Sequence, residues 1–97
     1  MTNKYLEIIK RFVVNELADE DVAIALFGSF ATSTNTGISD IDIAIIPKGK
    51  LQRWKLAIMR EKLEELTIPY CIDLVDFSMV SERFKKIALT DALWWRV

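Results

Sequence analysis

Three short apolar runs, each bounded by glycine or proline, constrain the fold of this chain more than any other feature. The runs are DVAIALFG at 21–28, DIDIAII at 40–46 and YCIDLVDF at 70–77. Gly28 closes the first run, and Pro47 follows the second. Apolar runs of this length between turn residues are typical of strands, and a continuous run is typical of a strand buried on both faces. We therefore predict three strands inside a small domain.

Helical periodicity appears in segments that precede, separate and follow these runs. Apolar residues recur every three or four positions in residues 3–17, in residues 51–66 and in a last segment that ends near Leu89. Residues 92–97, ALWWRV, form an aromatic tail for which the sequence predicts no structure. The alternation of strands with helices predicts an α/β or α+β domain, in which helices pack on a sheet.

The same periodicity assigns an apolar face to each helix. We expect Trp54 and Ile58 to widen the buried stripe of the second helix. Phe84 and Ile87 are expected on the buried side of the third helix, and Ser78 is placed to cap its start.

Composition excludes several classes of protein. The 97 residues, with 13 basic and 14 acidic side chains, predict a single domain over 1–97 without the positive field of a nucleic-acid binder. The absence of histidine excludes Ser-His-Asp and Cys-His catalysis and the commonest zinc sites. One cysteine, Cys71, excludes an internal disulfide. With no membrane-spanning run or signal-peptide core, we expect a cytoplasmic protein without membrane contact. The apolar share of 52% favours a homo- or hetero-oligomer.

Asp40 and Asp42 open the second predicted strand. Residues two apart in a strand point to the same face, so both carboxylates project together while Ile41 and Ile43 face the core. Two adjacent carboxylates stay ionised together only with a cation or several donors between them, and hard oxygen ligands suit Mg²⁺. The alternative is a strand-start cap beside a solvated aspartate, which is the better interpretation of a lone D-x-D motif.

Gly28 and Ser29 follow the first predicted strand directly. If a short helix starts there, its free backbone N–H groups form an anion site. Glycine permits close approach of a phosphate, and Ser29 offers a hydroxyl. A Gly-Ser pair alone is also a common turn. A phosphate site beside a carboxylate pair is, however, the arrangement that phosphoryl or nucleotidyl transfer requires.

The third predicted strand carries two aspartates, Asp73 and Asp76. Because they lie three residues apart, they must face opposite sides of the sheet, and alternation alone does not decide which one joins Asp40 and Asp42. Either could instead be an ion-pair partner for a helix.

These residues together resemble a known signature. The segments FGS at 27–29 and SDIDIAI at 39–45 look like the motif of the nucleotidyltransferase superfamily related to DNA polymerase β. The small size resembles the minimal nucleotidyltransferases, or MNT proteins. The segment IDLVD at 72–76 resembles the strand that supplies the third metal carboxylate, in a register that favours Asp73. The resemblance covers about residues 22–90.

The resemblance implies a mixed sheet with helices packed mainly on one face. Asp40, Asp42 and Asp73 would be catalytic and would hold two Mg²⁺ ions, and Gly28 and Ser29 would hold nucleotide phosphates. The reaction would transfer a nucleoside monophosphate, AMP from ATP, to an acceptor. Members of this family often pair with a HEPN-domain toxin, act as its antitoxin, and in some cases adenylylate it.

One departure from the family pattern supports an alternative. No Lys or Arg occurs between Gly28 and Lys48, where many members carry basic residues. A second hypothesis is therefore a catalytically weak or inactive MNT-fold module that neutralises a partner by complex formation, through a surface such as Trp94 and Trp95. A third is a structural or regulatory domain without nucleotide chemistry. For the enzyme, in the absence of histidine, Asp73 is the expected general base.

Overall fold

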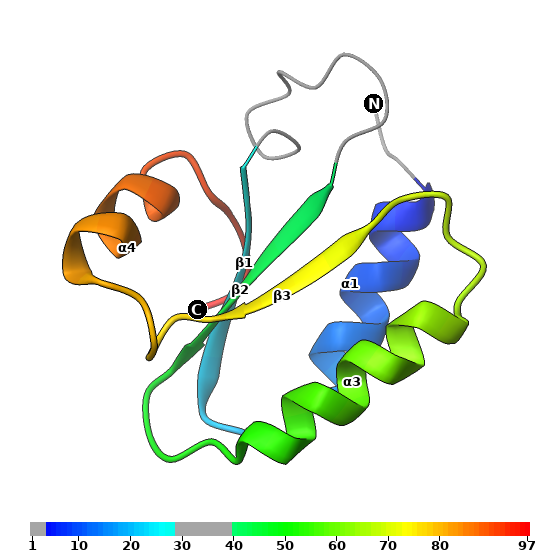
Figure 1. Ribbon diagram of the computed structural model, residues 1–97, viewed down its shortest axis with the longest axis horizontal. Helices are drawn as coiled ribbons and strands as arrows, with labels where there is room; N and C mark the ends of the chain where they lie inside the picture. The colour runs from blue at the N-terminus through cyan, green and yellow to red at the C-terminus, as the bar shows by residue number, and fades with distance from the viewer. Residues whose placement is uncertain (1–3, 29–39) are drawn as a thin grey trace.

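A four-stranded mixed sheet with the strand order β3-β2-β1-β4 forms the frame of the molecule (Figure 1). The structure is a computed structural model that describes residues 4–28 and 40–97. Strand β1 runs antiparallel to both β2 and β4, whereas β2 and β3 are parallel. The strands are β1 (Val22–Phe27), β2 (Ile41–Pro47), β3 (Ile72–Asp76) and β4 (Leu93–Arg96).

Three helices of the described residues cover the two faces of this sheet unequally. Helices α1 (Lys4–Glu16) and α3 (Arg53–Glu65) lie on one face, and the shorter α4 (Glu82–Leu89) lies on the other (Figure 1). The predicted α+β fold, with helices mainly on one face, is confirmed. Across the described ranges, no helix is both long enough and apolar enough to span a bilayer.

Strand alternation divides the buried side chains into two clusters. On the face covered by α1 and α3, the main core is made of large apolar residues from these two helices and from strands β1, β2 and β3. The face under α4 carries a smaller cluster built on Ala25, Phe27, Ala44 and Phe77. The main core contains Ile9, Val13, Leu17, Val22, Ile24, Leu26, Ile41, Ile43, Ile45, Leu56, Met59, Leu63 and Leu74.

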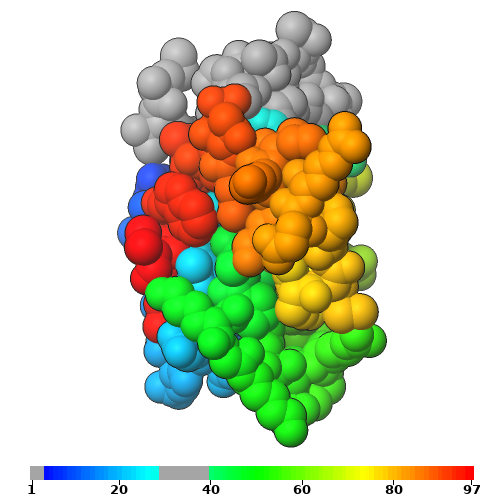
Figure 2. Space-filling model, turned by 90° about the vertical axis from the view of Figure 1, so that its left-hand side faces the viewer, coloured from blue at the N-terminus to red at the C-terminus, as the bar shows by residue number. Residues whose placement is uncertain are grey.

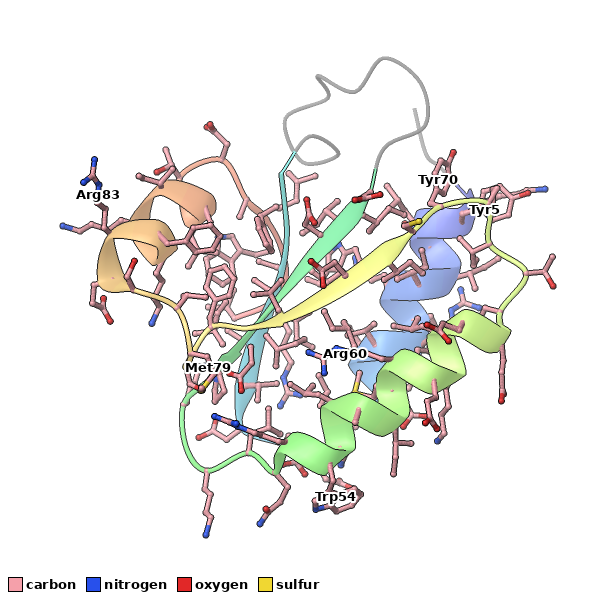
Figure 3. All side chains as sticks on the ribbon, viewed as in Figure 1. Tyr5, Trp54, Arg60, Tyr70, Met79 and Arg83 are labelled. Atoms are coloured by element: carbon pink, nitrogen blue, oxygen red, sulfur yellow. The ribbon has the colours of Figure 1, made fainter. Side chains whose placement is uncertain are left out.

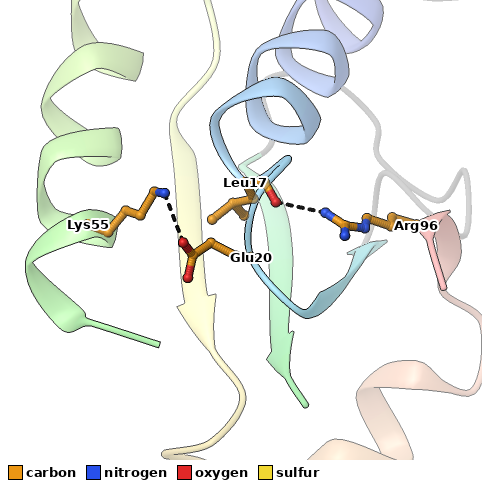
Figure 4. A network of polar contacts seen from close by, with 4 residues as sticks. All are labelled: Leu17, Glu20, Lys55 and Arg96. Atoms are coloured by element: carbon orange, nitrogen blue, oxygen red, sulfur yellow. Dashed lines mark hydrogen bonds and ion pairs between the residues drawn. The ribbon is translucent and has the colours of Figure 1, made fainter. Parts of the chain in front are cut away.

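Polar contacts tie the elements of the larger layer together at its rim. The Lys55 ammonium lies 3.1 Å from a carboxylate oxygen of Glu20, and the Arg96 guanidinium donates to the Leu17 carbonyl oxygen at 2.7 Å (Figure 4). The ion pair is partly exposed, so its contribution to stability is small, whereas the Arg96 bond satisfies a carbonyl at the end of α1.

The C-terminal residues, for which the sequence predicts no structure, form the edge strand β4. This strand pairs with β1, and its register shifts opposite Ile24 and Ala25. Trp95 packs against the main core, while Trp94 is 45% exposed. Figure 2 shows the C-terminal segment, in red, beside α4, in orange. The shift explains why the segment shows no clean alternation, because a β-bulge adds one residue to the strand.

Three side-chain predictions for the helices are wrong, and a fourth is met only in part. Phe84 is 43% exposed, although its ring contacts those of Phe27 and Phe77. Trp54 is 61% exposed and Ile58 is 41% exposed, because the stripe of Leu56, Met59 and Leu63 already covers the sheet. Ile87 is 66% exposed, because α4 contacts only one edge of the smaller cluster.

The predicted cap of the last helix is also wrong. Ser81, not Ser78, precedes α4, and its hydroxyl oxygen accepts a hydrogen bond from the Phe84 N–H at 3.1 Å. Ser78 instead donates from its hydroxyl and its backbone N–H to the Asp76 carboxylate. Both serines have a hydroxyl group that can cap a helix. Ser78 follows the end of β3 closely and bonds to Asp76, so Ser81 is the serine that caps α4.

We expect Ile43→Ala to lower the free energy of unfolding by about 2–5 kcal/mol, because Ile43 is fully buried at the centre of the main core. The matched control is Ile87→Ala on α4, where the side chain is exposed and the change should stay within about 0.5 kcal/mol. Urea titration followed by circular dichroism measures both. Equal losses in the two variants would contradict the assigned core.

Candidate functional site

Asp40 and Asp42 lie at the start of β2, on the sheet face opposite the main core. Asp42 stands in register between Phe27 of β1 and Asp73 of β3. Its strand neighbours Ile41 and Ile43 are fully buried in the main core, so Asp42 points to the face that α4 partly covers. Asp40, two residues earlier and directly before the strand, is exposed.

Strand β3 settles which of its two aspartates joins this pair. Leu74 is buried in the main core, so its neighbour Asp73 projects to the opposite face, beside Asp42. Asp76 lies at the far end of β3, where its carboxylate oxygen accepts from the Ser78 hydroxyl at 2.7 Å. The structure therefore brings Asp73 to the carboxylate pair and leaves Asp76 apart from it.

The edge position of β3 is protected by a helix side chain. The guanidinium of Arg60 on α3 donates to the Leu74 carbonyl oxygen at 2.8 Å (Figure 3). This bond satisfies the Leu74 carbonyl group on the outer edge of the sheet, directly after Asp73 in the chain.

Burial raises the pKa of Asp42 above its ordinary value, and the nearby carboxylates of Asp73 and Asp40 raise it further. Both effects disfavour the charged form, because a partly buried anion loses water and is repelled by like charges. Asp42 is thus the electrostatic centre of the three carboxylates, and a cation placed among them would remove the cause of the shift.

Gly28, directly after β1, lies close to the Asp42 side chain of the neighbouring strand β2. Its φ angle is 79°, in the left-handed region that favours glycine, and a Cβ atom there would overlap the carboxylate oxygen Oδ2 of Asp42. The sequence predicts a phosphate-binding role for Gly28 and Ser29; Ser29 lies outside the described residues. The structure gives Gly28 a further reason to be glycine, which is the space that Asp42 occupies.

The donor set of this site fits a hard divalent cation. Asp40, Asp42 and Asp73 offer only carboxylate oxygens, which are the ligands that Mg²⁺ prefers. In the described part of the chain, no three acidic or cysteine side chains already converge in a metal-binding cluster. Asp40 and Asp73 are thus close enough to Asp42 to raise its pKa, but the three carboxylates do not converge on one position.

An aromatic cluster that the sequence analysis missed borders the site. The ring centroids of Phe27 and Phe77 lie 5.3 Å apart, and the Phe84 ring of α4 lies 5.8 Å from that of Phe77. Because Phe27 is also the cross-strand neighbour of Asp42, this cluster anchors α4 beside the carboxylates. The one sequence feature that pointed to this cluster was the position of Phe27, directly before Gly28.

The sequence was also compared with models of protein families. Residues 7–93 match the family model described as polymerase beta, nucleotidyltransferase. A comparison with curated proteins gives no match.

Solved structures provide further similar folds. A chain of a toxin-antitoxin determined with AMP-PNP is 26% identical, with 89% of this chain and 71% of that chain covered and a TM-score of 0.68. A complex of MNT antitoxin with tri-AMPylated HEPN toxin from Shewanella oneidensis contains a chain that is 23% identical. There the match covers 92% of this chain and 70% of that chain, with a TM-score of 0.63, and shows the fold alone.

We expect Gly28→Ala to lower the free energy of unfolding by about 1–3 kcal/mol, because alanine would hold a strained backbone and press on the Asp42 carboxylate. Gly49→Ala is the matched control, since no atom lies within 4 Å of a Cβ placed there. Its change should stay within about 0.5 kcal/mol in the same chemical denaturation experiment. Comparable losses at both glycines would contradict the close approach of Gly28 to Asp42.

We expect Asp42→Asn to raise the melting temperature at pH 7 in a buffer that contains a chelator. The raised pKa of Asp42 means that its ionisation disfavours the folded state. The stability that protonated Asp42 contributes is complete below its ordinary pKa of 3.8 and is lost as the pH rises through the raised pKa. The asparagine variant escapes that loss, so its advantage should vanish at the lowest pH.

Melting curves across this pH range measure the effect, and Asp19→Asn at an exposed position is the control. A melting-temperature difference that does not change with pH would contradict the electrostatic cause.

Proposed function

Because the chain belongs to the polymerase beta nucleotidyltransferase family, we propose that it is a Mg²⁺-dependent enzyme that transfers AMP from ATP to a protein acceptor. We further propose that the acceptor is a HEPN-domain toxin and that the chain acts as its antitoxin. The observation that carries the proposal is the placement of Asp42 and Asp73 in register on adjacent strands, with Asp40 two residues before Asp42.

The roles of the three aspartates follow from their positions. Asp42, partly buried and flanked by two like charges, is the central ligand, and Asp40 and Asp73 complete the carboxylate set. Bound Mg²⁺ would neutralise the nucleotide phosphates and polarise the phosphorus that is attacked. The buried position of Asp42 holds the set to one side of the sheet, so substrate binds on the face that carries α4.

In the transfer step one bond to phosphorus forms and one breaks. The acceptor hydroxyl oxygen forms a bond to the α-phosphorus, the bond from that phosphorus to the bridging oxygen breaks, and pyrophosphate leaves. Asp73 takes the hydroxyl proton, since it is exposed beside Asp42 and the chain has no histidine to serve instead. Gly28 and Ser29 bind the nucleotide phosphates, and Gly28 also leaves the space that the Asp42 carboxylate occupies.

The partner proposal is supported by the solved structures with similar folds. One of them is a toxin-antitoxin determined with AMP-PNP, and another contains a tri-AMPylated HEPN toxin with its MNT antitoxin. A protein acceptor also suits a chain in which Phe84 and Trp94 are exposed on the site face, where Trp94 pairs with Ala25 of the smaller cluster.

The second candidate function is neutralisation by binding alone. The exposed Leu93 and Trp94 on the edge strand β4 favour it, because an aromatic edge offers contact area to a partner. The two functions differ in whether neutralisation survives loss of the carboxylates.

We expect Asp42→Asn to reduce transfer of label from α-phosphate-labelled ATP to background, while the protein remains folded. Asp73→Asn should reduce the rate by roughly 10²–10⁴-fold, as is typical for the loss of a general base. The assay mixes purified protein, Mg²⁺ and lysate of the source cells, and detects the labelled acceptor on a gel. The acceptor is then identified by mass.

The matched control is Asp76→Asn, which changes the other aspartate of β3 but leaves the carboxylate set intact. Its transfer should equal that of the unchanged protein. Transfer that persists in Asp42→Asn would overturn the enzyme proposal. Neutralisation of the partner by all three variants would favour binding alone.

A further inference from the structure

Strand β3 is an edge strand, and it carries one of the three carboxylates of the candidate site. Among the described strands it pairs with β2 alone, and Asp73 projects from it beside Asp42. An edge strand is bonded to the sheet on one side only, so its outer side has no ladder to fix it. The position of the Asp73 carboxylate therefore depends on what else holds β3 in place.

The outer side of β3 is held by one side chain of α3. Directly after β3, the Phe77 N–H donates to the Ile45 carbonyl oxygen of β2 at 2.8 Å, so odd-numbered residues there turn their backbone groups toward β2. Leu74 lies at an even position, and its carbonyl group points to the open edge, where Arg60 donates to it at 2.8 Å (Figure 3). Within the described part of the chain, no other side chain of α3 makes a hydrogen bond to the backbone of β3.

Unfilled space borders this contact at both ends of the strand. A cavity of about 360 Å³ is lined by Arg60 and by Ile72, at the start of β3. A second cavity, of about 210 Å³, is lined by Arg60 and by Asp76, at the end of β3. Because Arg60 borders both cavities, it bridges α3 and β3 at a place where the neighbouring side chains leave the strand edge loosely packed.

We propose that Arg60 is a positioning residue of the metal site. Its bond to the Leu74 carbonyl group holds β3 against β2, so that the Asp73 carboxylate stays beside Asp42. This inference rests on the proposed function, because it concerns the same carboxylates. Arg60 comes from α3, which covers the opposite face of the sheet, so it acts through the strand and not by contact with the ion.

The sign of the expected effect separates positioning from charge. Arg60→Met removes the hydrogen bond and keeps a long side chain with a similar preference for the helix. It also removes a positive charge, which by itself would favour the binding of a cation. Loss of a residue that orients a metal ligand typically weakens metal binding by about 10–100-fold. We expect Arg60→Met to raise the metal dissociation constant about tenfold, against the direction of the charge effect.

The test is a titration of the nucleotide-free protein with Mn²⁺, in which electron paramagnetic resonance measures the free ion. Mn²⁺ takes the same carboxylate ligands as Mg²⁺. The matched control is Arg53→Met, which removes the same charge from the same helix, but whose guanidinium donates to the exposed Met79 sulfur and not to β3. Its dissociation constant should not rise. Arg60→Lys keeps the charge and one donor, so its dissociation constant should lie between those of the unchanged chain and Arg60→Met.

A double-mutant cycle shows whether Arg60 acts through Asp73. Asp73→Asn alone should weaken Mn²⁺ binding, because it removes a carboxylate ligand. In that background Arg60→Met should change the dissociation constant less than about twofold, since the group that Arg60 positions is no longer a ligand. A merely structural role would not produce this result, because general loosening of the fold would weaken binding in both backgrounds.

Two results would overturn this role of Arg60 and leave the proposed function standing. One is equal Mn²⁺ binding by Arg60→Met and the unchanged chain, and the other is an effect of Arg60→Met that persists in full beside Asp73→Asn. An unchanged chain that binds no Mn²⁺ would instead overturn the carboxylate site, and the inference with it. Circular dichroism confirms that each variant is folded. If Arg60→Met does not fold, the same comparisons are made with Arg60→Lys.

Discussion

The parallel register between β2 and β3 is the constraint on which the site of this protein depends. Ile41 and Ile43 face the main core from β2, and Leu74 faces it from β3, which fixes both strands relative to the helices behind them. Because side chains alternate, that fixed placement sends Asp42 and Asp73 to the other face side by side. A slip of one residue in either strand would bury a carboxylate in the aliphatic core and expose an isoleucine or leucine. The same burial that stabilises the domain therefore assembles the carboxylates.

The site opposes the stability of the fold that holds it. Asp42 is partly desolvated and repelled by two neighbouring carboxylates, so its charge disfavours the folded state. Gly28, with its left-handed backbone, sits where any larger residue would overlap the Asp42 carboxylate. Sites that bind cations and phosphates commonly concentrate charge and strain in this way, and the surrounding core compensates for them. Here the compensation lies directly behind the site, in the fully buried isoleucines of β2.

The sequence predicted what strong periodicity determines and failed where tertiary contacts decide. The three apolar runs and the two long helices were predictable, as was the shared face of Asp40 and Asp42. Alternation alone left Asp73 and Asp76 equivalent, and only the family resemblance favoured Asp73. The register of β3 places Asp73 beside Asp42. Strand β4 was missed because its pairing to β1 is bulged, and Trp54 was misplaced because apolar character does not reveal which side of a helix the sheet occupies.

The two faces of the sheet separate the chemistry from the larger part of the core. The aspartates and α4 lie on one face, whereas α1 and α3 cover the other, where the aliphatic core is larger. The layer of α1 and α3 thus supplies most of the buried surface. The shorter α4 covers its face only in part, which leaves Asp40 and Asp73 exposed. Phe84 and Trp94 are exposed on the same face as these aspartates.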